Sequence, residues 1–135
     1  MRYKKKTKKT KRTDGFRSQF EANIAKYLSD NNISWEYESC KLTYAKPETY
    51  HTYTPDWLVK GMLIESKGRF TRQDRSKMLH VRTSNPNVLV RMVFMDAKVP
   101  IAKGSKTTYG DWCNKHNIEW CAFGDVKWKE WLECL

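Results

Sequence analysis

Charged side chains interrupt two apolar runs in the segment TPDWLVKGMLIESKG, residues 54–68. The dipeptide Lys60-Gly61 predicts a two-residue turn between two strands, and this turn would place Asp56 opposite Glu65. Facing side chains lie about 5 Å apart, where like charges destabilise the pair unless a proton or a cation lies between them. Two facing carboxylates supply the oxygen ligands that Mg²⁺ prefers. The segment therefore predicts a divalent metal site.

Lys67 follows Glu65 by two positions, so strand alternation sends both side chains to the same face of the sheet. The ammonium group would then lie at the edge of the metal pocket. A simpler interpretation is also open, in which Asp56 caps a turn after Pro55 and the other two charges cover a solvated strand face. The metal site depends on the register, because a longer turn would shift every pair.

Glu21 is a further candidate ligand, because it borders an apolar stripe that predicts a helix. The stripe consists of residues at helical spacing: Phe16, Phe20, Ile24, Tyr27 and Leu28. Thr13 or Asp14 is the expected cap of this helix. Glu21 would lean over the sheet and add a third carboxylate, or else form a capping box with Ser18 and bind backbone at the helix start.

The chain has 135 residues and a formal net charge of +11, which indicates a polyanionic partner. Its first twelve residues, MRYKKKTKKTKR, contain eight basic side chains and no acidic one. We expect residues 1–14 to be a disordered basic arm that neutralises nucleic-acid phosphates, the alternative being a localisation or solubility tail. The DNA-binding candidates of the arm are Lys4, Lys5, Lys6, Lys8, Lys9, Lys11 and Arg12.

Arginines outside the arm are additional candidates for phosphate contacts. Arg72, Arg75 and Arg82 share one side of a helix predicted for residues 72–83, and Arg17 lies near the start of the first helix. Guanidinium groups can hold phosphates through paired hydrogen bonds. A solvated helix face is the alternative for the row of three.

The four cysteines are widely spaced and form no C-x-x-C pair, which suits reduced thiols in the cytoplasm. Cys113, His116 and Cys121 would offer three zinc ligands, although packing within a helix is favoured because zinc sites normally show paired short spacings. No apolar h-region follows the basic arm and no run of about 18 apolar residues occurs, so neither a signal peptide nor a membrane span is expected.

The order of elements predicts one α/β domain with a mixed sheet over residues 15–135. Strands are expected at 33–38, 41–44, on both sides of Lys60-Gly61, at 88–95 and at 118–122. Helices are expected from the first stripe to about residue 30, at 72–83, from a cap at Ser105 or Thr107 to His116, and at 126–135 after a cap at Asp125. The segment 45–51, which contains Pro47, is expected to be an extended connection.

Pro55-Asp56 followed by Glu65-Ser66-Lys67, with Glu21 on a preceding helix, resembles the PD-(D/E)xK nuclease signature. More specifically, the chain is similar to the phage endonuclease I family, whose members resolve branched DNA. The similar stretches are FRSQFE (16–21), EYE (36–38), HTYTPDWL (51–58), ESKG (65–68) and KGSKTTYGDWCNKHNI (103–118).

The resemblance implies a restriction-endonuclease-like core, in which helices flank a central mixed β-sheet, and an intertwined homodimer. Residues 15–46 would be exchanged between subunits across a bridge at 45–51, so Glu21 of one chain would join Asp56, Glu65 and Lys67 of the other. The resemblance also implies two Mg²⁺ ions per site, with Mn²⁺ as a substitute. Asp56, Glu65 and the Ser66 carbonyl would hold the first ion, Glu21 and Glu65 the second, and Lys67 would orient the attacking water.

The implied activity is Mg²⁺-dependent hydrolysis of phosphodiesters in four-way (Holliday) junctions and other branched double-stranded DNA, in the host cytoplasm, with no membrane and no small-molecule cofactor. Other PD-(D/E)xK nucleases (mismatch-nicking, restriction-type or transposase-associated) are alternatives. A non-catalytic basic nucleic-acid-binding protein is another, although it explains the arm and not the hairpin carboxylates. Whether the final helix belongs to the core or to a dimer interface stays open.

Overall fold

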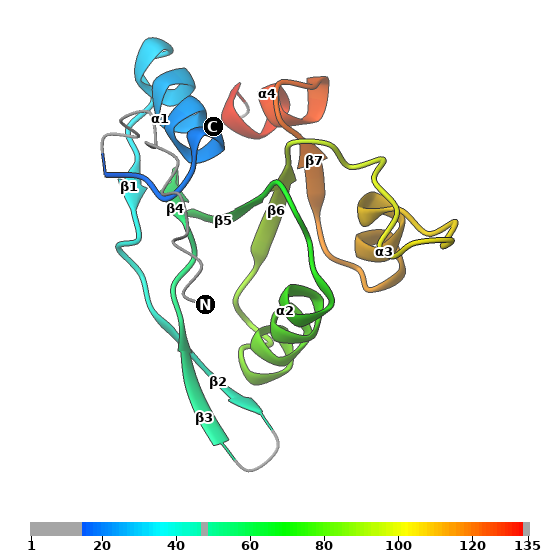
Figure 1. Ribbon diagram of the computed structural model, residues 1–135. Coiled ribbons are helices and arrows are strands. Elements are labelled where there is room, and N and C mark those ends of the chain that lie inside the picture. The colour runs from blue at the N-terminus through cyan, green and yellow to red at the C-terminus, as the bar shows by residue number, and fades with distance from the viewer. Residues whose placement is uncertain (1–14, 47–48, 134–135) are drawn as a thin grey trace, which may run out of the picture.

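A five-stranded mixed sheet organises the computed structural model, which describes residues 15–46 and 49–133 (Figure 1). The spatial order is β1-β4-β5-β6-β7. The strands are β1 (Glu36–Tyr37), β4 (Trp57–Val59), β5 (Met62–Lys67), β6 (Val90–Phe94) and β7 (Trp120–Ala122). The first three are antiparallel neighbours, while β6 and β7 continue the sheet in parallel with β5. The predicted mixed sheet is confirmed, and the predicted basic arm lies outside the described residues.

Four helices cover the two faces of this sheet. They are α1 (Gln19–Asp30), α2 (Arg72–Ser84), α3 (Tyr109–Lys115) and α4 (Val126–Glu133). α1 and α4 contribute to one hydrophobic core, and α2 and α3 to a second. β6 separates the cores, because Val93 belongs to the first and its neighbours Met92 and Phe94 to the second. Met92, Val93 and Phe94 of β6 are therefore buried on both faces of the sheet. None of the helices in the described ranges is long and apolar enough to cross a membrane.

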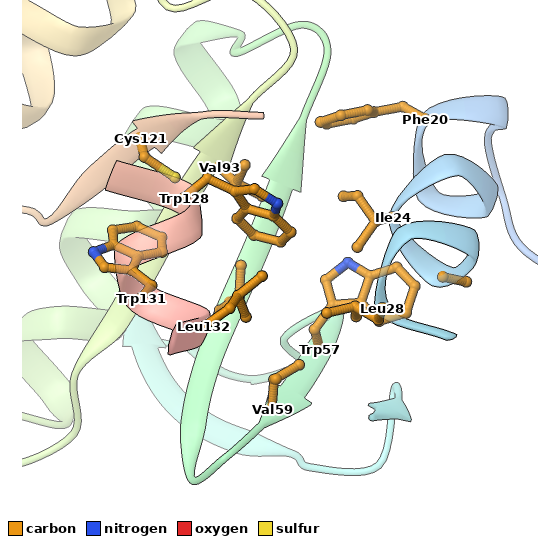
Figure 2. Packing of buried hydrophobic residues seen from close by; sticks show 12 residues of the cluster. Phe20, Ile24, Leu28, Trp57, Val59, Val93, Cys121, Trp128, Trp131 and Leu132 are labelled. Atoms are coloured by element: carbon orange, nitrogen blue, oxygen red, sulfur yellow. The ribbon is translucent and has the colours of Figure 1, made fainter. Parts of the chain in front are cut away.

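The final helix is a core element of the single chain. Figure 2 shows Phe20, Ile24 and Leu28 of α1 pointing toward Trp128 and Leu132 of α4. Trp128 is fully buried, and Asp125 caps the helix by accepting a hydrogen bond from the Trp128 backbone N–H at 2.8 Å. The predicted cap is therefore confirmed, and both tryptophans of α4, Trp128 and Trp131, are packed in the core.

The predicted hairpin turn has the expected register. Lys60 and Gly61 both have positive φ, at 49° and 76°, which a type I′ turn requires. Val59 pairs with Met62 and Leu58 with Leu63. The register on which the predicted metal site depends is thus confirmed.

The strands predicted at 88–95 and 118–122 are shorter than predicted, at Val90–Phe94 and Trp120–Ala122, and three other predicted boundaries differ as well. The cap of α1 is Ser18, whose hydroxyl accepts from the backbone of Glu21, and not Thr13 or Asp14, which lie outside the described residues. The cap of α3 is Thr108, because Asp111 completes its capping box. The strand predicted at 33–38 shortens to Glu36–Tyr37, and its carboxyl end stops where Glu38 adopts a φ of 50° that interrupts extended pairing.

The segment predicted as an extended connection is instead part of a two-stranded antiparallel sheet, β2 (Leu42–Lys46) and β3 (Thr49–Tyr53), with residues 47–48 outside the described part. Leu42 pairs with Tyr53 and Tyr44 with His51. Tyr44 and Tyr53 are buried in the core that includes α2, so alternation of apolar side chains favours pairing here. Figure 1 shows this hairpin extending away from the main sheet beside α2.

Gly110 in α3 lets the helix approach β7. A Cβ atom at this position would lie 2.5 Å from Cζ2 of Trp120, whose indole N–H is held by Asn114. We expect Gly110→Ala to lower the free energy of unfolding by roughly 1–3 kcal/mol, as overpacking does. An alanine in a helix otherwise stabilises by up to about 1 kcal/mol, so the sign of the change is informative.

Urea unfolding measures this effect, with Gly68→Ala as the matched control. A Cβ at Gly68 would meet Met95 Cε at 3.7 Å, an ordinary contact. A Gly110→Ala protein as stable as the wild type would contradict the packing described for α3 and β7.

Candidate active site

The carboxylate of Asp56 is fixed to the neighbouring strand by Ser66. Asp56 directly precedes β4, and its Oδ2 accepts hydrogen bonds from the Ser66 backbone N–H at 2.9 Å and from the Ser66 hydroxyl at 2.8 Å. Burial raises the pKa of Asp56, and the Ser66 bonds and the charge of Lys67 oppose that rise. The side chain is therefore held in one position beside the end of β5.

Glu65 lies in the interior at the same edge of the sheet. Its Oε2 accepts a short hydrogen bond from the Tyr53 hydroxyl, and its Oε1 lies 3.7 Å from Nζ of Lys67. Burial, together with the negative charge of Asp56, raises the pKa of Glu65 to about 8. Burial also raises the pKa of Tyr53, so its hydroxyl stays a donor. Tyr53 thus orients Glu65, a role that the sequence reasoning missed although Tyr53 lies within HTYTPDWL.

Glu21 reaches the site from α1. Ser18 caps the helix by accepting from the Glu21 backbone, as one sequence alternative expected, and its hydroxyl lies 3.4 Å from Glu21 Oε1. The carboxylate also accepts from the Tyr37 hydroxyl at 2.6 Å, which turns it toward β1. Burial raises the pKa of Glu21, opposed by the Tyr37 bond and reinforced by the charges of Asp56 and Glu38. Ser18 therefore supplies the cap, while the Glu21 carboxylate is bound by the Ser18 and Tyr37 hydroxyls and faces the site, so the site-facing alternative holds and the capping box is only half formed.

Glu38 is a site residue that the sequence reasoning did not select. One oxygen each from Glu21, Glu38 and Asp56 lie within 4.8 Å of one another, the one such acidic, histidine or cysteine group found among residues 15–46 and 49–133. The register explains this proximity, because Tyr37 pairs with Trp57 and the Glu38 N–H donates to the Asp56 carbonyl at 3.0 Å. The stretch EYE (36–38) could have indicated this role. A strand that ends at EYE and pairs antiparallel with β4 places Glu38 opposite Asp56.

The four predicted catalytic residues meet at one edge of the sheet, but their carboxylates fall into two groups. Glu21 and Asp56 join Glu38, whereas Glu65 faces Tyr53 and Lys67. Ser66 contacts Asp56 through its N–H and hydroxyl, and the role of its carbonyl as a ligand stays a prediction.

The donor set fits a hard divalent cation. All the groups are carboxylates, and burial raises the pKa of Glu21, Asp56 and Glu65 because loss of hydration disfavours their negatively charged form. Mg²⁺ and Mn²⁺ prefer such oxygen ligands. The site therefore has the chemistry and the excess negative charge that a bound cation would neutralise.

Lys67 is held between two carboxylates. Its Nζ lies 3.3 Å from Oδ1 of Asp74 and 3.7 Å from Oε1 of Glu65. Burial favours the neutral amine, but the charges of Glu65, Asp74 and Asp56 outweigh burial and raise the pKa of Lys67. Lys67 is therefore an ammonium group that points at the carboxylates, as predicted from strand alternation.

The predicted DNA-binding arginines have different surroundings. Nη1 of Arg75 donates to the carbonyls of Phe70 and Ile101, at 2.8 and 3.2 Å, so this side chain connects two loops. Arg72 and Arg82 are exposed on α2. Arg17 is exposed as well, and its Nε lies 2.9 Å from Oε1 of Glu38. DNA binding by these residues and by the arm stays a prediction.

The zinc alternative has no geometric support in the described ranges. Cys113 is buried in the core with α2, whereas Cys121 is buried in the core with α1 and α4, so the sheet lies between them. Burial raises the pKa of the Cys113 thiol to about 12. Packing, the favoured alternative, explains both cysteines.

Comparison with known proteins gives a consistent set of relatives. The family model described as phage endonuclease I matches residues 1–133. Endonuclease I of Escherichia phage T7 is 39% identical over 110 residues, which cover 81% of this chain and 74% of that protein. Endodeoxyribonuclease 1 of Enterobacteria phage T3 is 41% identical over 104 residues, which cover 76% of this chain and 68% of that protein.

The buried carboxylates predict that the metal-free protein loses stability as the pH rises. Glu65 titrates near 8 when folded and near 4.5 when unfolded, so between these values the folded state binds the proton more tightly. We expect the free energy of unfolding in EDTA to fall by about a few kcal/mol from pH 5 to pH 8.

Urea unfolding of wild-type protein and a Glu65→Gln variant checks this expectation. The variant should show a weaker pH dependence, and the exposed control Glu119→Gln should follow the wild type. Equal slopes for wild type and Glu65→Gln would show that Glu65 is not protonated in the folded state at neutral pH.

Proposed function

Because the chain belongs to the phage endonuclease I family, we propose that this DNA-cleaving enzyme is a Mg²⁺-dependent endonuclease selective for four-way junctions and other branched double-stranded DNA. The observation that carries the proposal is the convergence of Glu21, Asp56, Glu65 and Lys67 at one sheet edge. It works in the cytoplasm of the infected host cell, where branched DNA is available.

The residues of the site divide the work of hydrolysis. By the resemblance, Asp56, Glu65 and the Ser66 carbonyl would hold one ion, and Glu21 and Glu65 would hold a second. The closeness of Glu38 to Glu21 and Asp56 supports Glu38 as an extra oxygen donor. Bound divalent ions supply an acidified water nucleophile and neutralise charge on the phosphate. Lys67 orients that water, while Tyr53 and Ser66 keep Glu65 and Asp56 in place.

Positive charge beside the site supports contact with the DNA backbone. A shallow depression of about 490 Å³ lies between β2 and α2 and is lined by Lys46, Gln73 and Lys77 together with Asp74. The basic arm and the exposed side chains of Arg17, Arg72 and Arg82 would add phosphate contacts, while Arg75 joins the loops that contain Phe70 and Ile101. Phosphate contacts carry no sequence information. Selectivity therefore comes from the shape and deformability of branched DNA.

The working form is an intertwined homodimer in which residues 15–46 are exchanged. In the single chain, α1 and β1 connect to the rest of the sheet through the β2–β3 hairpin. Opening this hairpin at 45–51 would let the same contacts form with a second copy, the usual route of domain swapping. A two-fold dimer with two sites matches the symmetry of a four-way junction and would nick two strands of like polarity.

Substitution of the catalytic residues tests the activity. We expect Asp56→Asn and Lys67→Ala to lower the Mg²⁺-dependent cleavage rate of a four-way junction by about 10²-fold or more, with junction binding retained. Gel assays with a junction, a bulge and a linear duplex give the rates and the substrate preference. The exposed Asp30→Asn serves as the control. Wild-type rates in Asp56→Asn, or binding without scission by wild-type protein, would refute the proposal.

Mixed dimers test the exchange separately. If each site takes Glu21 from one chain and Asp56 from the other, refolding Glu21→Gln together with Asp56→Asn creates one intact site per mixed dimer. We expect this mixture to regain nicking of one strand, whereas the two variants purified and mixed without unfolding should stay inactive. No recovery after joint refolding would place a complete site within each chain.

A further inference from the structure

Lys67 needs more than one contact to stay in a single position. A lysine side chain has four flexible carbons, so holding it in one rotamer costs conformational entropy. The Lys67 side chain is 25% exposed, and its 3.7 Å contact with Glu65 is longer than a hydrogen bond. The shorter contact, at 3.3 Å, is with Oδ1 of Asp74 on α2. The ammonium group is therefore located chiefly by a residue outside the metal-binding carboxylates.

Asp74 is itself rigid, because it completes the capping box of α2. Its Oδ2 accepts from the Thr71 N–H and from the Thr71 hydroxyl, both at 2.9 Å, while the Asp74 N–H donates to the Thr71 hydroxyl. α2 is anchored by Met78 and Val81, which are buried in the core. These bonds occupy Oδ2 and direct Oδ1 toward Lys67. The hydrogen bonds from Thr71 and the charge of Lys67 outweigh burial and lower the pKa of Asp74, so it carries a negative charge.

α3 shows that a capping box of this type does not require a lysine. Thr108 and Asp111 form the same reciprocal pair at the start of α3. Asp111 is exposed and takes part in no ion pair within the described ranges. The contact with Lys67 is therefore a feature of Asp74 beyond helix capping.

We propose that Asp74 is a positioning residue of the nuclease: it holds the Lys67 ammonium group beside Glu65 in the orientation that hydrolysis requires. This inference rests on the proposed function. Asp74 does not contact the reacting atoms and acts through Lys67. A capped and buried α2 thereby sets the position of a side chain that belongs to β5.

The Asp74→Asn variant tests this role, because the amide oxygen can still accept from Thr71 while the charge facing Lys67 is lost. We expect kcat for junction cleavage to fall about 10- to 100-fold, the range that misplacement of a catalytic group by about 1 Å produces. KM and the junction Kd in EDTA should change less than about twofold, and Asp74→Glu should recover part of kcat. The matched control Asp111→Asn changes the same type of capping box and should leave kcat unaltered.

A double-mutant cycle shows whether Asp74 works through Lys67. Adding Asp74→Asn to Lys67→Ala should cause no further loss of kcat, since the side chain being positioned is already absent. Additive losses, a wild-type kcat in Asp74→Asn, or an equal loss in Asp111→Asn would each overturn the proposal.

A measurement without DNA separates this inference from the proposed function. The ¹⁵N NMR signal of the Lys67 ammonium group should report an ordered, slowly exchanging group in wild type and Asp111→Asn, and a disordered one in Asp74→Asn. An unchanged signal in Asp74→Asn overturns the positioning role even when cleavage proceeds. An ordered signal in a wild-type protein that cuts no DNA instead refutes the proposed function.

Discussion

Crowding of negative charge in a largely desolvated space is the constraint on which the rest of this structure depends. Glu21, Asp56 and Glu65 are all shifted toward the protonated form, and burial is the main cause in each case. Isolated buried charges are destabilising, so such a group persists only where other bonds hold it or where an ion completes it. The protein supplies the holding bonds through Tyr37, Tyr53 and Ser66.

Each holding bond depends in turn on packing away from the site. The Tyr37 ring lies edge-on to Phe16 at 4.7 Å and packs against Trp57 at 5.1 Å, which fixes the hydroxyl that faces Glu21. Tyr53 is buried between the β2–β3 hairpin and the core that contains α2. The two hydrophobic cores on opposite faces of the sheet therefore act as supports for the polar groups at its edge. Apolar cores on both faces with polar groups at the edge form a rigid scaffold, which keeps the catalytic side chains close to one another.

The end of β5 and the start of α2 both contribute charged side chains to the site. β5 delivers Glu65 and Lys67, and the turn after it leads directly into the capping box of α2. The ammonium group of Lys67 partly neutralises the charge of Glu65, and the carboxylate of Asp74 in turn lies close to that ammonium group. The positive charge of Lys67 lies between the carboxylates of Glu65 and Asp74, which reduces the cost of burying these three groups together.

The sequence by itself determined the features that depend on neighbours in the chain. The Lys60-Gly61 turn, the alternation that brings Lys67 to the face of Glu65, and the apolar stripe of α1 follow from local geometry with periods of 2.0 and 3.6 residues. The resemblance to a nuclease family rested on motifs in one order, and the family assignment is shown. Only tertiary structure decided that Glu38 faces Asp56, that Arg75 is used internally, and that Cys113 and Cys121 lie on opposite faces of the sheet. These relations join residues far apart in the chain, and they are set by strand pairing and burial, which no local pattern of side chains specifies.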